Sequence, residues 1–204
     1  MKKSERTRQF IIQQSAVLFN QKGYDGTTLQ NIIDATGLSK GAIYGNFKKE
    51  GVDKKGVKME IAVAAFDYAV LEINNIIGSR TRIIENTIDK LKTVVYFYKE
   101  RILNPPIEGG CPILNTSIDA DDNHPRLKKR VENALNEWRS RLVHTIQKGM
   151  KRGEIRKDIN PGEFATQFIG TLEGGIMLAR IHRDNEQFNI MARLLLQQIE
   201  LIRC

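Results

Sequence analysis

Apolar residues recur every three or four positions along most of this chain, and that spacing places them on one side of an α-helix. The pattern is clearest from Pro125 to about Arg152, where successive apolar residues lie 4, 4, 3, 4 and 4 positions apart. The residues of this stripe are Leu127, Val131, Leu135, Trp138, Leu142 and Ile146. We find no convincing strand pattern and no repeat, so the sequence predicts an all-α fold.

The ends of the other helices are predicted from capping residues, glycines and prolines. Thr27–Gln30 has the form of a capping box, and Ser39 is a predicted N-cap. Asn160 followed by Pro161 predicts the start of a late helix, and Gly78–Ser79 predicts a break. The helices are expected over residues 4–22, about 27–35, 39–47, 58–77, 81–101, 112–120, 161–183 and about 184–203.

Positive charge is concentrated in the first quarter of the chain. Residues 1–58 contain 11 Lys and Arg against 5 Asp and Glu, whereas residues 59–204 contain 21 against 19. This asymmetry suggests a polyanionic partner for the N-terminal part, although a merely soluble basic face would show the same charge. We expect two domains, over residues 1–50 and 51–204.

The stretch GLSKGAIYGNF, residues 37–47, carries two glycines inside a predicted helix. Each glycine costs about 1 kcal/mol relative to alanine. The helices expected at about 27–35 and 39–47, joined by a tight turn with a glycine, make a candidate helix-turn-helix unit. In such a unit the second helix lies in the major groove of DNA. If Ile43 and Phe47 pack inward, Gly41 and Gly45 face outward and let the backbone come close to the DNA. The alternative is a three-helix unit that merely packs, in which the glycines permit close helix contacts.

Several side chains near these glycines suit contacts with DNA. Lys40 and Lys48 can neutralise phosphates, and Tyr44 can bond a phosphate or pack on a thymine methyl. Asn46 can contact a base edge or the backbone. Thr27 and Thr28 precede a helix, where backbone N–H groups bind anions.

The run FNQKGYDGTTLQNIIDATGLSKGAIYGNFKKE, residues 19–50, resembles the DNA-binding domain of the TetR (tetracycline repressor) family. The matching residues include Phe19, Gly23, Tyr24, Thr27, Thr28, Ile32, Ala35, Gly37, Ser39, Ile43, Tyr44 and Phe47. The resemblance implies a helix-turn-helix DNA-binding domain over residues 1–50 and a helical ligand-binding and dimerisation domain over residues 51–204. It also implies a homodimer that binds double-stranded, pseudo-palindromic operator DNA, usually as a repressor, until a small-molecule effector releases it. The two cysteines are far apart and form no disulfide framework, so a reduced, cytoplasmic setting is expected. The DNA-facing positions are then Thr27, Thr28, Ser39, Lys40, Gly41, Ala42, Tyr44, Gly45, Asn46 and Lys48.

The chain departs from the family pattern after Phe47. The route to Ala64 is longer by roughly two helical turns, and Glu50 stands where a phosphate-binding lysine is often found. Lys49, Lys54 or Lys55 could take over that contact. The alternative function is therefore a helical interaction module of the same fold that has lost DNA binding.

The C-terminal part is expected to supply the dimer interface and an effector pocket. The helices at 125–152 and 161–183 are the predicted dimer helices. GGCPILNTSIDADD and GTLEGGIMLAR resemble regulatory domains of one branch of the family, including regulators that respond to reactive electrophiles and small organic compounds. The predicted pocket residues are Tyr96, Phe97, Tyr98, Cys111, Asn115, Trp138, Phe168 and Met177; such aromatic residues and methionines are more often plain core.

Cys111 precedes Pro112 at a predicted helix N-terminus, where a thiol's pKa is lowered and the reactive thiolate is favoured. One hypothesis is that Cys111 senses an electrophile or oxidant; the alternative is that it only shapes the pocket. The cluster DADDNH, residues 119–124, lacks the spacing of a metal site. No catalytic motif, cofactor, signal peptide or membrane span is expected.

Overall fold

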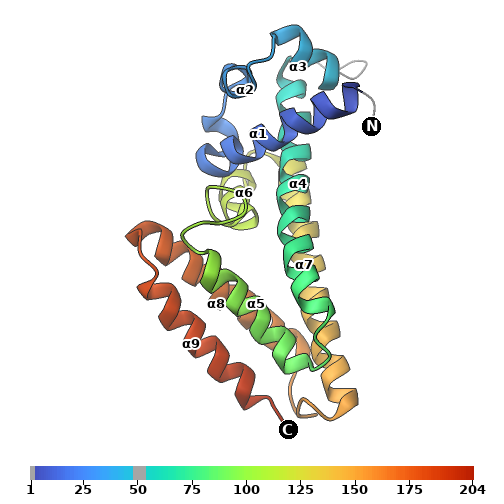
Figure 1. The fold of residues 1–204 in the computed structure, drawn as a ribbon, viewed down its shortest axis with the longest axis vertical. Helices are drawn as coiled ribbons and strands as arrows, with labels where there is room; N and C mark the ends of the chain where they lie inside the picture. Colours follow the sequence, from blue (N-terminus) through green and yellow to red (C-terminus); the bar gives the residue numbers. More distant parts are fainter. Residues whose placement is uncertain (1–2, 48–53) are drawn as a thin grey trace. The chain divides into compact units, whose positions relative to one another are not determined.

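The computed structural model describes residues 3–47 and 54–204, and these residues form nine helices (Figure 1). Their only β-type pairing is an isolated antiparallel bridge between Ile155 and Arg203. The prediction of an all-α fold is confirmed. The helices are α1 (Lys3–Gly26), α2 (Leu29–Thr36), α3 (Lys40–Phe47), α4 (Lys54–Arg82), α5 (Thr87–Arg101), α6 (Pro112–Ala120), α7 (Pro125–Arg152), α8 (Pro161–His182) and α9 (Glu186–Leu201).

The residues fall into two compact units. Unit 1 consists of Met1–Glu72 with Ile107–Glu132, and unit 2 consists of Ile73–Pro106 with Asn133–Cys204. The long helices α4 and α7 each contribute residues to both units. The division of the chain into domains at residue 50 remains a prediction.

Unit 1 is built around α1, which packs against α2, α3 and α6. A small cluster brings Ala16 of α1 together with Ala65 and Ala69 of α4, where the small side chains allow close packing. The main cluster contains residues from α1, α2, α3 and α4, so the three N-terminal helices share one core. Its buried members are Ile11, Ile12, Ile32, Ile43, Phe47, Val57 and Ile61.

The helix ends of unit 1 largely follow the predicted signals. Gly23 has φ 72° and interrupts α1, and Gly37 ends α2 with φ 65°, a backbone conformation that glycine adopts without strain. The capping box lies one residue later than predicted. Thr28, rather than Thr27, is the N-cap of α2, and it exchanges hydrogen bonds with Asn31.

The predicted break at Gly78–Ser79 is wrong, because α4 continues through these residues to Arg82. A single glycine costs too little to end a long helix, and no described atom outside its own helix crowds Gly78. The next helix, α5, begins directly after its N-cap Asn86, whose side chain accepts hydrogen bonds from the N–H groups of Ile88 and Asp89. The capping by Asn86 therefore decides where α5 begins.

By length and composition, the part of α4 from Gly56 to Arg82 is apolar enough to cross a membrane, because an 18-residue window within it has a mean hydropathy of 1.4. Its buried side chains in unit 1, among them Val57, Ile61 and Phe66, pack in that unit's hydrophobic core. In all, 33% of the apolar window is buried, and the buried part packs as part of a globular core does.

In unit 2, α9 packs along both α8 and α5 (Figure 1). Gly175 permits close approach, because a Cβ there would lie only 3.0 Å from the Phe188 ring. The chain end is also held: Arg156 donates its backbone N–H to Ile202 at 2.9 Å, and Cys204 donates to Glu154 at 3.2 Å. The C-terminal residues are thus part of the packed unit.

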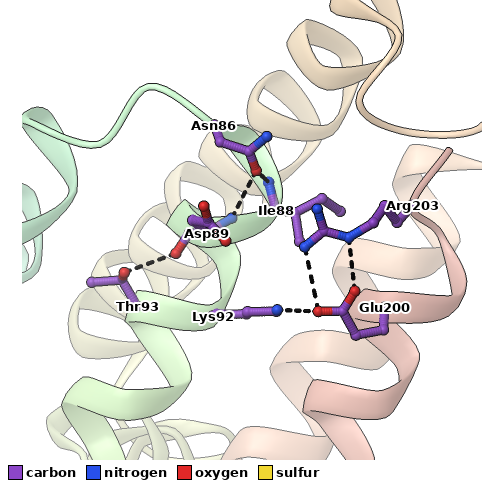
Figure 2. A network of polar contacts seen from close by, with 7 residues as sticks. All are labelled: Asn86, Ile88, Asp89, Lys92, Thr93, Glu200 and Arg203. Atoms are coloured by element: carbon purple, nitrogen blue, oxygen red, sulfur yellow. Dashed lines mark hydrogen bonds and ion pairs between the residues drawn. The ribbon is translucent and has the colours of Figure 1, made fainter.

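A polar network ties the end of α9 to α5 (Figure 2). The Glu200 carboxylate accepts a hydrogen bond from Arg203 Nε at 2.8 Å and forms an ion pair with Lys92 of α5. The hydrogen bonds from Arg203 and Lys92 lower the pKa of Glu200 to about 2 from the usual 4.5. The negative charge of Glu200 is therefore favoured in the folded state.

Replacing Glu200 with glutamine is expected to destabilise the protein at neutral pH and to matter less in acid. Because the folded pKa is depressed, the charged carboxylate contributes stability above pH 4.5, and this is lost as pH falls towards about 2. Thermal melts of both proteins across this range measure the effect. Glu137→Gln is the control, because the ion pair between Glu137 and Arg141 is long, at 4.0 Å. A stability difference that stays constant in acid would contradict the expectation.

Candidate nucleic-acid interface

The predicted DNA-reading helix, α3, has one buried side and one open side. Ile43 and Phe47 are 0 % and 2 % exposed, as their inward packing requires. The residues predicted to face DNA lie on the remaining surface. Lys40, Gly41 and Gly45 are exposed, and Ala42, Tyr44 and Asn46 are half-buried.

Neither glycine of α3 is explained by packing within the described part of the chain. A Cβ added to Gly45 would meet no described atom within 4 Å, and one added to Gly41 would meet only Ser39 Oγ, at 3.9 Å. Alanine would therefore fit at both positions and favour the helix. The interpretation that these glycines permit close contacts between helices is not supported by these surroundings.

The side chains around the glycines are partly pre-arranged. Lys40 Nζ lies 5.9 Å from the centre of the Tyr44 ring, so a positive charge accompanies the ring at the surface. Asn46 donates its side-chain N–H to Ala42 at 2.8 Å, and Ser39 Oγ accepts the N–H of Ala42 at 3.2 Å. Both ends of this short helix are thus hydrogen-bonded.

The two threonines before α2 have different surroundings. Thr28 is exposed, and its Oγ1 accepts the N–H of Asn31 at 3.1 Å. Thr27 is fully buried, and its hydroxyl donates to the Gly23 carbonyl at 2.7 Å. The Thr27 side chain therefore stabilises the turn and is not one of the proposed DNA contacts.

The predicted phosphate contact Lys48, together with Lys49 and Glu50, lies outside the described residues. That Lys49, Lys54 or Lys55 makes the phosphate contact in place of Glu50 therefore stays a prediction.

Two residues of α1 that sequence reasoning missed support the helix-turn-helix unit. Arg8 donates Nη1–H to the backbone carbonyl of Asn46 at 2.9 Å, and Asn20 is a buried amide, 6 % exposed. Both continue the buried stripe of Ile12 and Ala16 at intervals of four residues. A polar residue on an apolar stripe was the signal that could have identified them.

Asn20 joins α1 to the loop before α6 and to α6 itself. Its Nδ2 donates to the carbonyls of Glu108 at 2.9 Å and Gly110 at 3.1 Å. Asn115, a predicted pocket residue, donates back to Asn20 Oδ1 at 2.8 Å. A Cβ at Gly109, whose φ is 114°, would lie 2.7 Å from the Asn20 carbonyl oxygen. The loop therefore fits closely around one buried amide.

Tyr24, just beyond the break in α1, is surrounded by charged groups of unit 1. Its backbone N–H is bonded by Asp119 of α6, and Lys58 Nζ lies 4.1 Å from the centre of its ring. His124 packs edge-on against the ring and lies 3.0 Å from Asp25. Burial, with Asp25 nearby, raises the pKa of Tyr24, and burial lowers the pKa of Lys58. These contacts hold the end of α1 within unit 1.

The eight predicted pocket residues are distributed over both units. Cys111 and Asn115 belong to unit 1, and the others belong to unit 2. Phe97, Cys111 and Phe168 are buried, whereas Tyr96 and Met177 are 45 % and 47 % exposed in this chain. The remaining three, Tyr98, Asn115 and Trp138, are half-buried. Their role in binding an effector remains a prediction.

Unit 1 contains a small cavity lined in part by Asn20, Tyr24, Thr116 and Asp119, with a volume of about 20 Å³. A space of this size holds a water molecule rather than an organic effector. None of the eight predicted pocket residues lines it.

Cys111 carries a buried thiol at the N-cap of α6, and its side chain does not form the capping hydrogen bond. An electrophile or oxidant would need this site to open before reaching the sulfur. Within residues 3–47 and 54–204, no group of three or more His, Cys, Asp or Glu is placed to hold a metal ion.

The chain matches known proteins along most of its length. The family model described as bacterial regulatory proteins of the tetR family matches residues 11–50. The model described as the tetracyclin repressor-like C-terminal domain matches residues 87–195. The second match alone spans more than half of the chain and includes α5 to α8.

Solved structures agree with these matches. A TetR transcriptional regulator from Chloroflexus aurantiacus is 36% identical, with 98% of this chain and 97% of that chain covered and a TM-score of 0.90. A TetR-family regulator from Cytophaga hutchinsonii is 33% identical, with 100% and 98% covered and a TM-score of 0.87. The repressor DhaR of a Mycobacterium species is 23% identical over 183 residues, 88% of this chain and 85% of DhaR.

These matches confirm the resemblance of the N-terminal residues and extend it through the regulatory helices. The chain belongs to the TetR family of helix-turn-helix transcriptional regulators.

Proposed function

We propose that this protein is a repressor that binds a pseudo-palindromic operator as a homodimer and is released by a small-molecule effector. The observation that carries the DNA-binding part is the exposed face of α3, where Gly41 and Gly45 leave open space beside Lys40 and Tyr44. Close approach to another backbone or to DNA is a common reason for glycine in such positions. The name of the relative DhaR, a transcriptional repressor, supports the direction of regulation.

In this proposal α3 enters the major groove. Lys40 neutralises a phosphate, and the Tyr44 ring and hydroxyl contact a thymine methyl or a phosphate. Thr28 and the first N–H groups of α2 bind the neighbouring phosphate, because a helix N-terminus carries partial positive charge. Ser39, Ala42 and Asn46 complete the contact surface, together with Lys48. A regulator of this kind acts in the cytoplasm on operator DNA.

A gel-shift titration of the purified protein tests this proposal. The first DNA is the region upstream of its own gene, and a random-site selection supplies an operator if that region does not bind. Binding should weaken steeply between low and high salt, because phosphate contacts release counterions. Tyr44→Ala should lose roughly tenfold or more in affinity and keep its thermal stability to within a few degrees. Failure of the selection would favour the interaction module that has lost DNA binding.

The proposed dimer interface consists of α8 and α9. Among the described residues of α7 no large apolar side chain is exposed, whereas α8 exposes Met177 and Ile181 and α9 exposes Ile190 and Leu194. The predicted pair of α7 and α8 is therefore replaced in this proposal by α8 and α9. Apolar faces of this kind on two packed helices suit an isologous interface.

Introducing charge into this surface is expected to separate the protomers. Leu194→Glu should raise the dimer dissociation constant by roughly 100-fold, because it buries an unpaired carboxylate at the interface. Sedimentation velocity over a concentration series measures the change. Ile83→Glu is the control, since Ile83 is 84 % exposed and lies between α4 and α5. Equal dissociation of the two variants would argue against the interface.

A further inference from the structure

The last turn of α3 is held from outside the helix. The final carbonyls of an α-helix have no partner within the helix. In α3, which ends at Phe47, the carbonyl of Asn46 accepts a hydrogen bond from Arg8 Nη1 of α1 at 2.9 Å. Arg8 is thus hydrogen-bonded to the backbone of the turn that follows Tyr44 and Gly45.

The same guanidinium also covers a side chain of that turn. The Arg8 Cζ atom lies 4.1 Å from the centre of the Phe47 ring, which is the geometry of a cation–π contact. Phe47 is 2 % exposed and belongs to the main core cluster of unit 1. Arg8 therefore connects the backbone and the core anchor of the last turn to α1, and its positive charge suits a helix C-terminus.

Helix α3 needs such support more than most helices. It has eight residues, which is too short for stability in isolation, and two of them are glycines. Its position consequently depends on contacts at its two ends. Ser39 caps the first turn, and Arg8 holds the last. An error in the last turn would displace Tyr44, Gly45 and Asn46 together.

We propose that Arg8 is a positioning residue for DNA recognition: it fixes the C-terminal turn of α3 without contacting the DNA itself. This inference rests on the proposed function for its consequence in DNA binding. Its structural part, that Arg8 orders residues 43–47, holds in the free protein. The planar guanidinium supplies both the hydrogen bond and the stacking, so lysine at this position is not equivalent.

The variants Arg8→Gln, Arg8→Lys and Arg6→Gln test the role. Arg6 is the matched control, because it is an exposed arginine on the same helix, two residues away. Dissociation constants are measured for the selected operator and for a scrambled duplex at four salt concentrations. Amide hydrogen exchange of residues 43–47 is measured in the full-length free proteins. Thermal melts verify that each variant is folded.

We expect Arg8→Gln and Arg8→Lys both to lose about tenfold in operator affinity. Their affinity for the scrambled duplex should change about as little as that of Arg6→Gln. The salt slope should stay at the wild-type value, because no phosphate contact is removed, and residues 43–47 should exchange at least tenfold faster. Full operator binding by Arg8→Lys would overturn the proposal. A salt slope reduced by about 0.9 in Arg8→Gln would do the same, since it indicates one lost phosphate contact.

The two levels of the proposal fail separately. If wild-type protein selects no DNA, the proposed function fails, but the exchange experiment still tests whether Arg8 orders α3. Unchanged exchange of residues 43–47 in Arg8→Gln would overturn the positioning role even if the wild-type protein binds its operator. If Arg8→Gln proves unfolded, Arg8→Lys, which keeps the charge and most of the side-chain volume, decides the question.

Discussion

Replacing Gly45 with alanine should make the free protein more stable and its operator complex weaker. The Cβ would enter open space among the described residues, and alanine favours the helix by about 0.5–1 kcal/mol. If α3 lies in the major groove, the same methyl group enters the space between the helix backbone and the DNA. We expect operator affinity to fall about tenfold for Gly45→Ala and at least 100-fold for Gly45→Leu.

Opposite signs for stability and binding make this prediction specific. Thermal unfolding gives the first quantity, and a fluorescence-anisotropy titration on the selected operator gives the second. Gly78→Ala is the matched control, because Gly78 also lies within a helix with open space around it but outside α3. It should stabilise the protein to a similar extent and leave operator affinity unchanged. Wild-type affinity in Gly45→Leu would show that this face of α3 does not meet DNA.

The second large effect is expected at Asn20. Asn20→Leu removes two short hydrogen bonds to the carbonyls of Glu108 and Gly110 and the acceptor for Asn115. The bond to Gly110 is buried and the bond to Glu108 is part-buried, so these carbonyls lose a partner where access to water is limited. Asn115 keeps its hydrogen bonds to the backbone carbonyls of residues 20 and 109. An unsatisfied buried polar group costs about 1–3 kcal/mol, so we expect a loss of about 2–4 kcal/mol. The melting temperature should fall by about 5–15 °C.

Differential scanning calorimetry measures this loss, and Asn136→Leu provides the comparison on an exposed helical asparagine. That control should change stability by less than about 0.5 kcal/mol. Asn20→Asp should be at least as destabilising as Asn20→Leu, because its carboxylate cannot donate to the carbonyls around it and would repel them. If Asn20→Leu melts with the wild type, the network around Asn20 contributes nothing to stability.

The helices and most of their ends could be predicted from the sequence, because both depend on residues close together in the chain. Gly23 and Gly37 end helical turns through their own backbone freedom, and Asn160 caps α8 through its neighbours Gly162 and Glu163. The inward packing of Ile43 and Phe47 followed from spacing alone. The errors were also local. The capping box lies one residue later than the pattern predicts, and Gly78 does not end α4, because a single glycine costs too little to break a long helix.

Contacts between residues far apart in the chain were not predictable in this way. Arg8 meets Asn46 across 38 positions, and Asn20 meets Asn115 across 95. Helical spacing shows which face of a helix is buried, but it does not identify the atoms packed against that face. The positions of the helices, and the exposed positions of the two glycines of α3, therefore followed from residues close together in the chain. Only the tertiary structure decided that α1 supplies the arginine at the end of α3 and the buried amide that holds the loop before α6.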